Sequence, residues 1–534
     1  MNNPLSSFET AGHPLKERAP QLPALLVWRA SLRMALVSAA GVVAAGLMAS
    51  GLAGCADMSG IAPQATVRDA ASLGLGTAPA PATAPVAAVD AQWWRGFGDE
   101  TLNGLVEQAL QDSPNLRLAQ ARLARAQAVT ESARSATGPQ VGGQLDLTRQ
   151  RYTANGAVPP PLTGSILNSG TAQLAGSWEL DFFGKNRAAL DAALGSARAA
   201  QADAQAARVL LASQVARTYF QLVRLNAQQD VAQRALAQRE ETLGLVRDRV
   251  SAGLDTRLEL RQSEGGLPEA RLQLETVREQ MALTRNALHA LLGQPGSTAP
   301  LVPSAPSAIK PIALAPVIPA DLLGRRADVA AARWRVEAAT RDVDNARTQF
   351  YPNINLVAFA GFSSLGLGQL FDAGSQQWGV GPALRLPVFE SGRLRANLRG
   401  RTADLDAAVE SYNAAVIDAV REVADQLASL QAIDRQQLEQ RAAQDAAESA
   451  YDIAVQRYKA GLANYLNVLT AETGVLAQRR LAVDLAGRAL ETQVALARAL
   501  GGGYAPEVLP AAQDAPKIIA ANAGAASAKP PFNP

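Results

Sequence analysis

Residues 184–196 read GKNRAALDAALGS, and residues 392–404 read GRLRANLRGRTAD. The two stretches share residues at an offset of 208: Gly184/Gly392, Arg187/Arg395 and Leu190/Leu398. The same offset continues without a gap to residues 293 and 501, where both copies end in Leu-Gly. Upstream, 114–141 aligns with 327–354. One structural unit has therefore been duplicated in tandem, and we predict a first repeat at 91–313 and a second at 314–502.

Both repeats show the same order of elements. A helical segment, at 100–136 and again at 321–349, ends before a proline, which cannot continue a helix. Two short strand-like stretches follow, and then a very long helical run (184–250, then 392–458), a turn at Ala-Gly-Leu and a return helix. A run of about 65 residues spans roughly 100 Å. These rods are rich in Ala and lack long Leu heptads, which argues against the alternative of a fibrous coiled coil.

The strand-like stretches are 141–147, 171–182, 354–362 and 377–389, and their residues alternate in polarity. In the second stretch, Leu174 and Trp178 fall on one face and Gln173 on the other. A half-buried strand of a soluble sheet has the same period. The strand lengths, the aromatic residues near strand ends and the long Gly- and Pro-rich loops favour strands that cross an outer membrane.

Four strands cannot close a barrel around water, and an open sheet edge in lipid leaves backbone groups unpaired at several kcal/mol each. We therefore expect the chain to assemble with copies of itself. Three copies would supply 12 strands and 12 long helical segments, a cylinder wide enough for a channel. The predicted fold class is mainly α with a small β part.

The composition excludes several classes of function. Lys and Arg number 50 and Asp and Glu 48, so no basic surplus indicates nucleic-acid binding. The chain has one Cys and two His, and His13 lies in the predicted leader, which leaves neither paired histidines nor a Cys cluster for a metal site. We find no nucleophile–base pair and no phosphate-binding loop. The sequence predicts no enzyme activity, no metal and no cofactor.

The first 54 residues resemble a signal peptide. An uncharged stretch from Met34 to Gly54 follows four basic residues and ends in Leu52-Ala53-Gly54-Cys55. This tetrapeptide resembles the bacterial lipobox, in which the Cys becomes the lipidated first residue. We therefore expect cleavage before Cys55 and a covalent lipid on it; the alternative is an ordinary helical anchor. Residues 55–90 and 503–534 are rich in Ala, Pro and Gly, and are predicted to be a lipidated tether and a flexible tail.

Six motifs together resemble one known family. They are Trp93-Trp94 with Phe97 and Asp99, WELDFFGKNR at 178–187, RRADV at 325–329, FYPNI at 350–354, LPVFESGRLRA at 386–396 and RYKAGLANYLNVL at 457–469. This set is similar to the TolC-like outer-membrane factors, within them the OprM-like lipoprotein branch (NodT type). The resemblance implies a homotrimer with an outer-membrane β-barrel continued by a long periplasmic α-helical barrel. It further implies a Gram-negative outer-membrane efflux channel that docks onto a periplasmic adaptor protein and an inner-membrane pump of the resistance-nodulation-division (RND) type.

In this family the periplasmic tip, where the long and return helices meet, closes through polar and charged contacts. Carried over by position, the gate comprises Asp255, Arg257, Glu259 and Arg261 in the first repeat and Asn464, Tyr465 and Asn467 in the second. Rings of polar residues are a common means of gating a pore. The alternative is that these residues only cap and solvate a helical hairpin.

Two other functions remain open from the sequence. The same channel could serve type I protein secretion in place of the efflux of small toxic molecules. A lipid-anchored helical spacer without a pore would be a structural envelope protein, and it would give no conductance.

Overall fold

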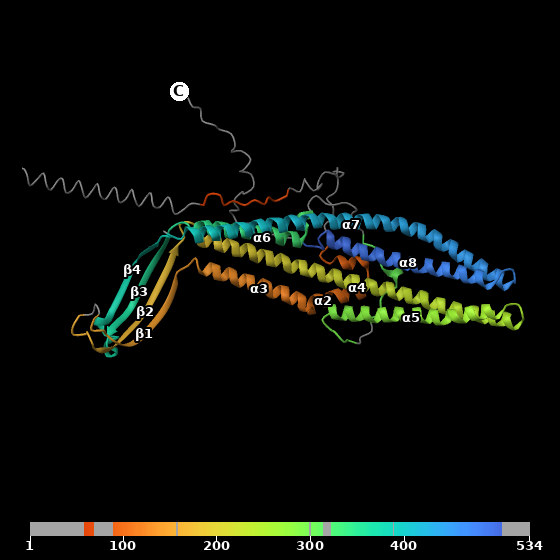
Figure 1. Cartoon of the computed structure of the whole chain (residues 1–534), viewed down its shortest axis with the longest axis horizontal. Coiled ribbons are helices and arrows are strands. Elements are labelled where there is room, and N and C mark those ends of the chain that lie inside the picture. The colour runs from red at the N-terminus through yellow and green to blue at the C-terminus, as the bar shows by residue number, and fades with distance from the viewer. Residues whose placement is uncertain are drawn as a thin grey trace, which may run out of the picture.

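A computed structural model describes residues 58–68, 89–155, 159–297, 301–312, 322–387 and 389–504. The described chain is elongated (Figure 1), with a four-stranded sheet at one end and a pair of helical hairpins reaching to the other. The predicted leader and Cys55 lie outside these ranges, as do most of the predicted tether and tail. The predicted boundary between the repeats lies at the edge of the undescribed residues 313–321.

The two repeats contain corresponding elements in the same order. The first has α2 (Glu100–Asp112), α3 (Pro114–Ser135), β1 (Gln140–Arg151), β2 (Ile166–Leu180), α4 (Lys185–Ser251) and α5 (Arg257–Leu291). The second has α6 (Ala327–Thr348), β3 (Asn353–Leu365), β4 (Gln376–Arg385), α7 (Ser391–Lys459) and α8 (Tyr465–Ala499). Short 3-10 turns occur at Trp93–Phe97, Pro306–Ala308, Leu322–Arg325, Leu367–Gln369 and Ala373–Ser375.

The predicted long rods are present as α4, of 67 residues, and α7, of 69 residues. At 1.5 Å per residue each spans about 100 Å. The helical segment expected at 100–136 differs from the prediction, because it is broken into α2 and α3 at Ser113. The backbone of Ser113 is extended (φ −64°, ψ 124°), as expected for a residue before a proline.

The helices form a sheath four helices wide along its whole length. In the half nearer the sheet, neighbouring helices are α3 with α4, α4 with α6, and α6 with α7. In the other half, α5 packs on α4, α4 on α8, and α8 on α7. Small residues allow close approach, since a Cβ added at Gly195 of α4 would lie 3.1 Å from the Cα of Ala338 in α6.

The largest apolar cluster lies midway along the helices, where α2 packs on α4. Phe97 and Phe220 pack edge to face there, with ring centroids 4.7 Å apart. Asp99 caps α2 and accepts a 2.6 Å hydrogen bond from the hydroxyl of Tyr219. Among the described helices, none combines the length and the apolar character that crossing a bilayer requires.

The sheet is an antiparallel meander in the order β1-β2-β3-β4. The register pairs Gly143 with Leu174, Leu174 with Ala360, and Ala360 with Trp378. This row crosses all four strands on one face. Because side chains alternate between faces along each strand, the apolar residues that the sequence placed together on each strand share a single face of the sheet, which confirms the predicted alternation.

Candidate functional site

One face of the sheet carries a ladder of glutamine side chains. Gln377 of β4 donates to Gln173 of β2 (3.1 Å), and Gln173 donates to Gln144 of β1 (3.4 Å). Gln144 then donates to the carboxylate of Asp146 (2.6 Å). Gly361 of β3 lies in the same row, between Gln173 and Gln377, and a Cβ added to it would come within 2.5 Å of the Cα of Gln173. This face is suited to contact with water.

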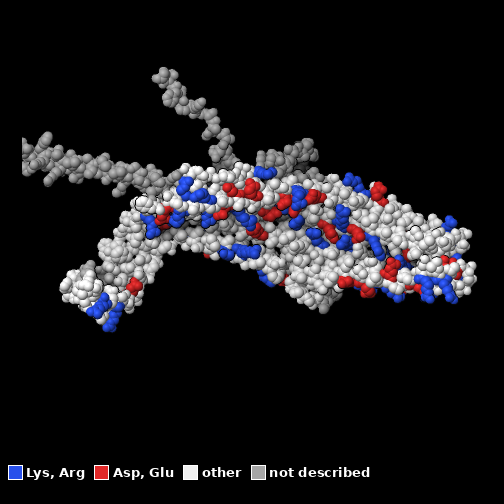
Figure 2. Space-filling model, viewed as in Figure 1, with Lys and Arg blue, Asp and Glu red and all other residues white. Residues whose placement is uncertain are grey.

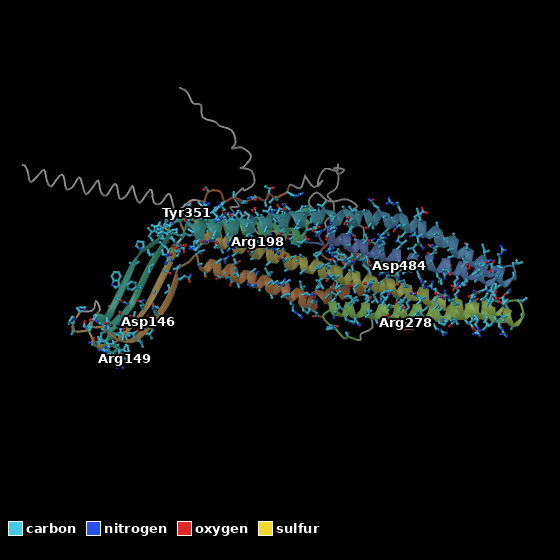
Figure 3. The ribbon with its side chains drawn as sticks, viewed as in Figure 1. Asp146, Arg149, Arg198, Arg278, Tyr351 and Asp484 are labelled. Carbon is cyan, nitrogen blue, oxygen red and sulfur yellow. The ribbon has the colours of Figure 1, made fainter. Side chains whose placement is uncertain are left out.

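The opposite face is apolar and faces outward from the single chain. Leu145, Trp378 and Val380 are all more than 60% exposed on it. Charged residues within the strands lie near the strand ends, apart from Asp146 on the polar face. Figure 2 accordingly shows an uncharged band between the junction with the helices and the far end of the sheet. Figure 3 places Arg149 at that far end and Tyr351 at the junction. An outward-facing apolar band of this kind is typical of a lipid-facing surface.

The far end of the helices holds a second polar site, where the α4–α5 turn meets the end of α7. Asp255 accepts hydrogen bonds from Arg249 Nε (3.0 Å) and Nη2 (3.3 Å), and also from the hydroxyl of Tyr458. Arg249 further donates to the main-chain oxygen of Tyr458 (3.0 Å), and its guanidinium lies 4.5 Å from the centre of that ring. Three side chains therefore join the first hairpin to the second.

Hydrogen bonding and charge favour the ionised form of the Asp255 carboxyl group. Burial alone would raise the pKa of Asp255, but the hydrogen bonds from Arg249 and Tyr458 outweigh burial and hold the pKa below its ordinary value. Burial and the hydrogen bond to Asp255 together raise the pKa of the Tyr458 hydroxyl, so this hydroxyl remains a donor at neutral pH.

The structure brings only some of the predicted gate residues together. Glu259 closes a capping box at the start of α5, accepting from the Thr256 N–H (3.0 Å). Arg257 is exposed, and Arg261 pairs with Glu264 one turn along α5. The side chain of Asn464 caps α8 by accepting from the N–H of Asn467 (3.3 Å). These residues serve their own hairpins, whereas Asp255 bridges both.

Tyr465 is buried, at 4% exposure, with its ring 6.1 Å from that of Tyr458. Together with Val246 and Val475 it forms an apolar cluster between the hairpins. Tyr465 therefore contributes to the tip through apolar packing between the two hairpins.

Sequence reasoning missed several charged residues that join the helices further from the tip. Arg239 of α4 links the two hairpins by pairing with Glu472 of α8 (3.1 Å), and it also pairs with Glu269 of α5 within the first hairpin (3.0 Å). Within the second hairpin, Arg479 of α8 makes a two-pronged contact with Glu448 of α7 (2.6 and 2.5 Å). A signal was present, because Arg249, Glu472, Arg479 and Glu448 all recur at the offset of the duplication.

The predicted lipidation site, Cys55, lies outside the described residues. In the part of the chain that is described, no group of three or more His, Cys, Asp or Glu side chains is placed to hold a metal ion.

Comparison with known proteins agrees with this geometry. Residues 105–294 and 318–502 match the family described as Outer membrane efflux protein, one match for each repeat. The multidrug resistance outer membrane protein MdtQ of Escherichia coli O157:H7 is 33% identical over 430 residues, which cover 78% of this chain and 88% of that protein. The fusaric acid resistance protein FusA of Burkholderia cepacia is 38% identical over 353 residues, covering 65% and 66%.

Solved structures show the same fold. The outer membrane protein VceC of Vibrio cholerae matches with a TM-score of 0.74 and 37% identity, covering 78% of this chain and 99% of that one. The open state of the MtrE outer membrane channel of Neisseria gonorrhoeae matches with a TM-score of 0.71 and 26% identity, covering 83% and 98%. These structures belong to the trimeric TolC-like channels, which confirms the predicted fold class. The polar ladder, the apolar outer face and the two linked helical hairpins agree with the family match over both repeats. The chain therefore belongs to the outer membrane efflux proteins and forms an outer-membrane efflux channel of tripartite pumps.

Proposed function

We propose that three copies of this chain form a passive exit duct for small toxic molecules, driven by an RND pump through a periplasmic adaptor. The observation that carries the proposal is that the described sheet has two unpaired edge strands. Within the described residues, β1 and β4 each have a strand on one side only. In lipid, such edges would leave backbone groups unpaired. Pairing β4 of one copy with β1 of the next closes a barrel of 12 strands, with the glutamine ladders facing its interior.

The cargo class is inferred from the relatives. MdtQ is named for multidrug resistance and FusA for resistance to fusaric acid. Both names refer to resistance against small molecules, which supports small-molecule efflux over the alternative, type I protein secretion. A structural spacer without a pore would not need a polar ladder across one face of a lipid-facing sheet.

The helical tips offer the surface on which a periplasmic adaptor would dock. Leu254 and Leu258 at the first hairpin and Leu462 and Leu466 at the second are each more than half exposed. The pairs are related by the duplication, so three copies would present six equivalent apolar contacts. Isolated exposed leucines are ordinary, but a repeated set at one end of the molecule marks an interaction site.

Two further parts of the proposal concern the anchor and the chemistry. Cys55 would carry the covalent lipid that holds the N-terminus in the outer membrane. The channel would have no enzymatic activity and need no cofactor, so the energy for export would come from the pump.

The test is deletion of the gene followed by complementation. We expect deletion to lower the inhibitory concentration of several toxic small molecules at least fourfold and to leave the set of secreted proteins unchanged. Complementation with L254D/L462D should assemble in the outer membrane but fail to restore resistance. Unchanged sensitivity together with a missing secreted polypeptide would instead establish the type I alternative.

A further inference from the structure

The described N-terminal segment, residues 58–68, lies along α7 on the outside of the helical sheath (Figure 1). Apolar contacts place its first part, because Met58, Ile61 and Ala65 pack against a cluster that includes Leu394, Leu405 and Val409. The guanidinium of Arg395 also donates to the main-chain oxygen of Ser59 (3.1 Å). The segment therefore begins near the sheet end of α7.

Four hydrogen bonds join the second part of the segment to two side chains of α7. Asp406 Oδ1 accepts from the main-chain N–H groups of Gln64 and Ala65, both at 2.9 Å. Asn413 accepts from the N–H of Arg68 (2.9 Å) and donates to the main-chain oxygen of Thr66 (3.0 Å). All four bonds involve main-chain atoms of the segment and none involves its side chains.

The spacing of the two residues suits an extended chain. Asp406 and Asn413 are seven residues apart, so they lie on one face of α7, about 10 Å apart. From Arg395 to Asn413 the helix rises about 27 Å, while the nine residue-to-residue steps from Ser59 to Arg68 can reach about 30 Å. The segment must therefore run along the helix with little spare length.

We propose that Asp406 and Asn413 form a main-chain clamp that fixes the register of the N-terminal segment on α7. Its ligand is an extended polypeptide, recognised through its peptide groups, and the occupant is residues 64–68 of this chain. Asn413 has the two functions that this role needs, one donor and one acceptor on a planar amide, and it is buried.

The rest of the N-terminal region could not set this register. Val89, where the described chain resumes, packs near Val423 of α7, about 15 Å along the helix from Asn413. Twenty residues lie between Arg68 and Val89, and a chain of that length can span about 70 Å. The position of Val89 alone therefore does not fix the register, whereas the clamp does. Two residues separate Cys55 from Met58, so a lipid on Cys55 would be attached within about 10 Å of Met58, near the sheet end of α7. This last consequence rests on the proposed lipid anchor, and the clamp itself does not.

The test is amide hydrogen exchange of the full-length protein in lipid nanodiscs. In the wild type, the amides of Gln64, Ala65 and Arg68 should exchange at least tenfold more slowly than in a free peptide of the same sequence. Asp406→Ala should free Gln64 and Ala65 only, and Asn413→Ala should free Arg68 only, a local pattern that general unfolding would not produce. Asp404→Ala is the matched control, since this exposed carboxylate on the same helix pairs with Arg401.

Wild-type rates in both variants, or an unprotected segment in the wild type, would overturn the clamp. The intact mass, compared between wild type and Cys55→Ser, reports the anchor separately. A protein without lipid but with the expected exchange pattern would retain the clamp and refute the anchor. A lipidated protein in which neither substitution changes the exchange rates would retain the anchor and refute the clamp.

Discussion

Asp255 provides a buried carboxylate that joins the two hairpin tips. Its carboxylate accepts from two partners, Arg249 and Tyr458, and its side chain is only 8% exposed. Asp255→Ala leaves both donors without their acceptor, and an unsatisfied buried group costs about 1–3 kcal/mol. Since that loss weakens the link between the two hairpins, we expect the population of separated tips to rise about tenfold or more and the mean conductance in planar bilayers to increase.

Asp248→Ala provides the control for this experiment. Asp248 lies one turn before the end of α4, and it is exposed. Its removal should leave conductance unchanged. If both alanine variants behaved alike, Asp255 would have no part in closing the tip, and Tyr458→Phe would be expected to have no effect either.

The same carboxylate sets a pH dependence. Its folded-state pKa lies below the ordinary value of about 4. A depressed pKa means that the link is fully present above the unfolded pKa and is lost only as the pH falls through the lower, folded value. We therefore expect conductance to stay constant between pH 7 and about pH 5 and to rise only below about pH 4. In Asp255→Ala this acid step should be absent. Opening of the wild type near pH 6 would show that another group controls the tip.

Among the helices, the ion pair between Arg239 and Glu472 should contribute more than its neighbours. The Glu472 side chain is 6% exposed, whereas Glu269, which contacts the same guanidinium, is 75% exposed. Removing one partner of a buried pair costs about 3–5 kcal/mol. Without Glu472, Arg239 would keep only the exposed Glu269 as an ionic partner, and an exposed pair contributes about 0–1 kcal/mol. Glu472→Ala should therefore speed amide exchange in α8 near the tip by two orders of magnitude or more, and Glu269→Ala by less than tenfold. Equal effects would contradict the buried role of Glu472.

Much of the element order could be predicted, because it depends on local sequence patterns. Alternation identified the four strands, and the absence of proline identified α4 and α7. The break at Ser113 was missed because the apolar and Ala-rich pattern continues across it. The links between hairpins were not predictable, since Arg239 and Glu472 are 233 residues apart. Their pairing depends on the lengthwise register of α4 against α8, which small side chains leave open.

At the scale of the molecule, one duplication yields both halves of the duct. Each repeat contributes two strands to the sheet and one long hairpin to the sheath. The repeats differ at the tip, where Asp255 of the first corresponds to Ala463 in the second. Hence the bridging carboxylate occurs once in each chain, and the clustered polar contacts of the described tip lie between the hairpins of one subunit.

Two neighbouring residues of β1 can test whether the apolar face of the sheet lies against lipid in the assembled barrel. Leu145 is 64% exposed on the apolar face, and Gln144, next to it, belongs to the polar ladder. An Arg on a lipid face near the bilayer midplane costs about 2–4 kcal/mol, and a trimer would bear three. Leu145→Arg should therefore abolish heat-modifiable trimers in the outer-membrane fraction. Gln144→Arg adds the same side chain one position away, facing water, and should assemble normally while shifting ion selectivity toward anions. If both variants assembled equally well, this face of the sheet would not lie against lipid.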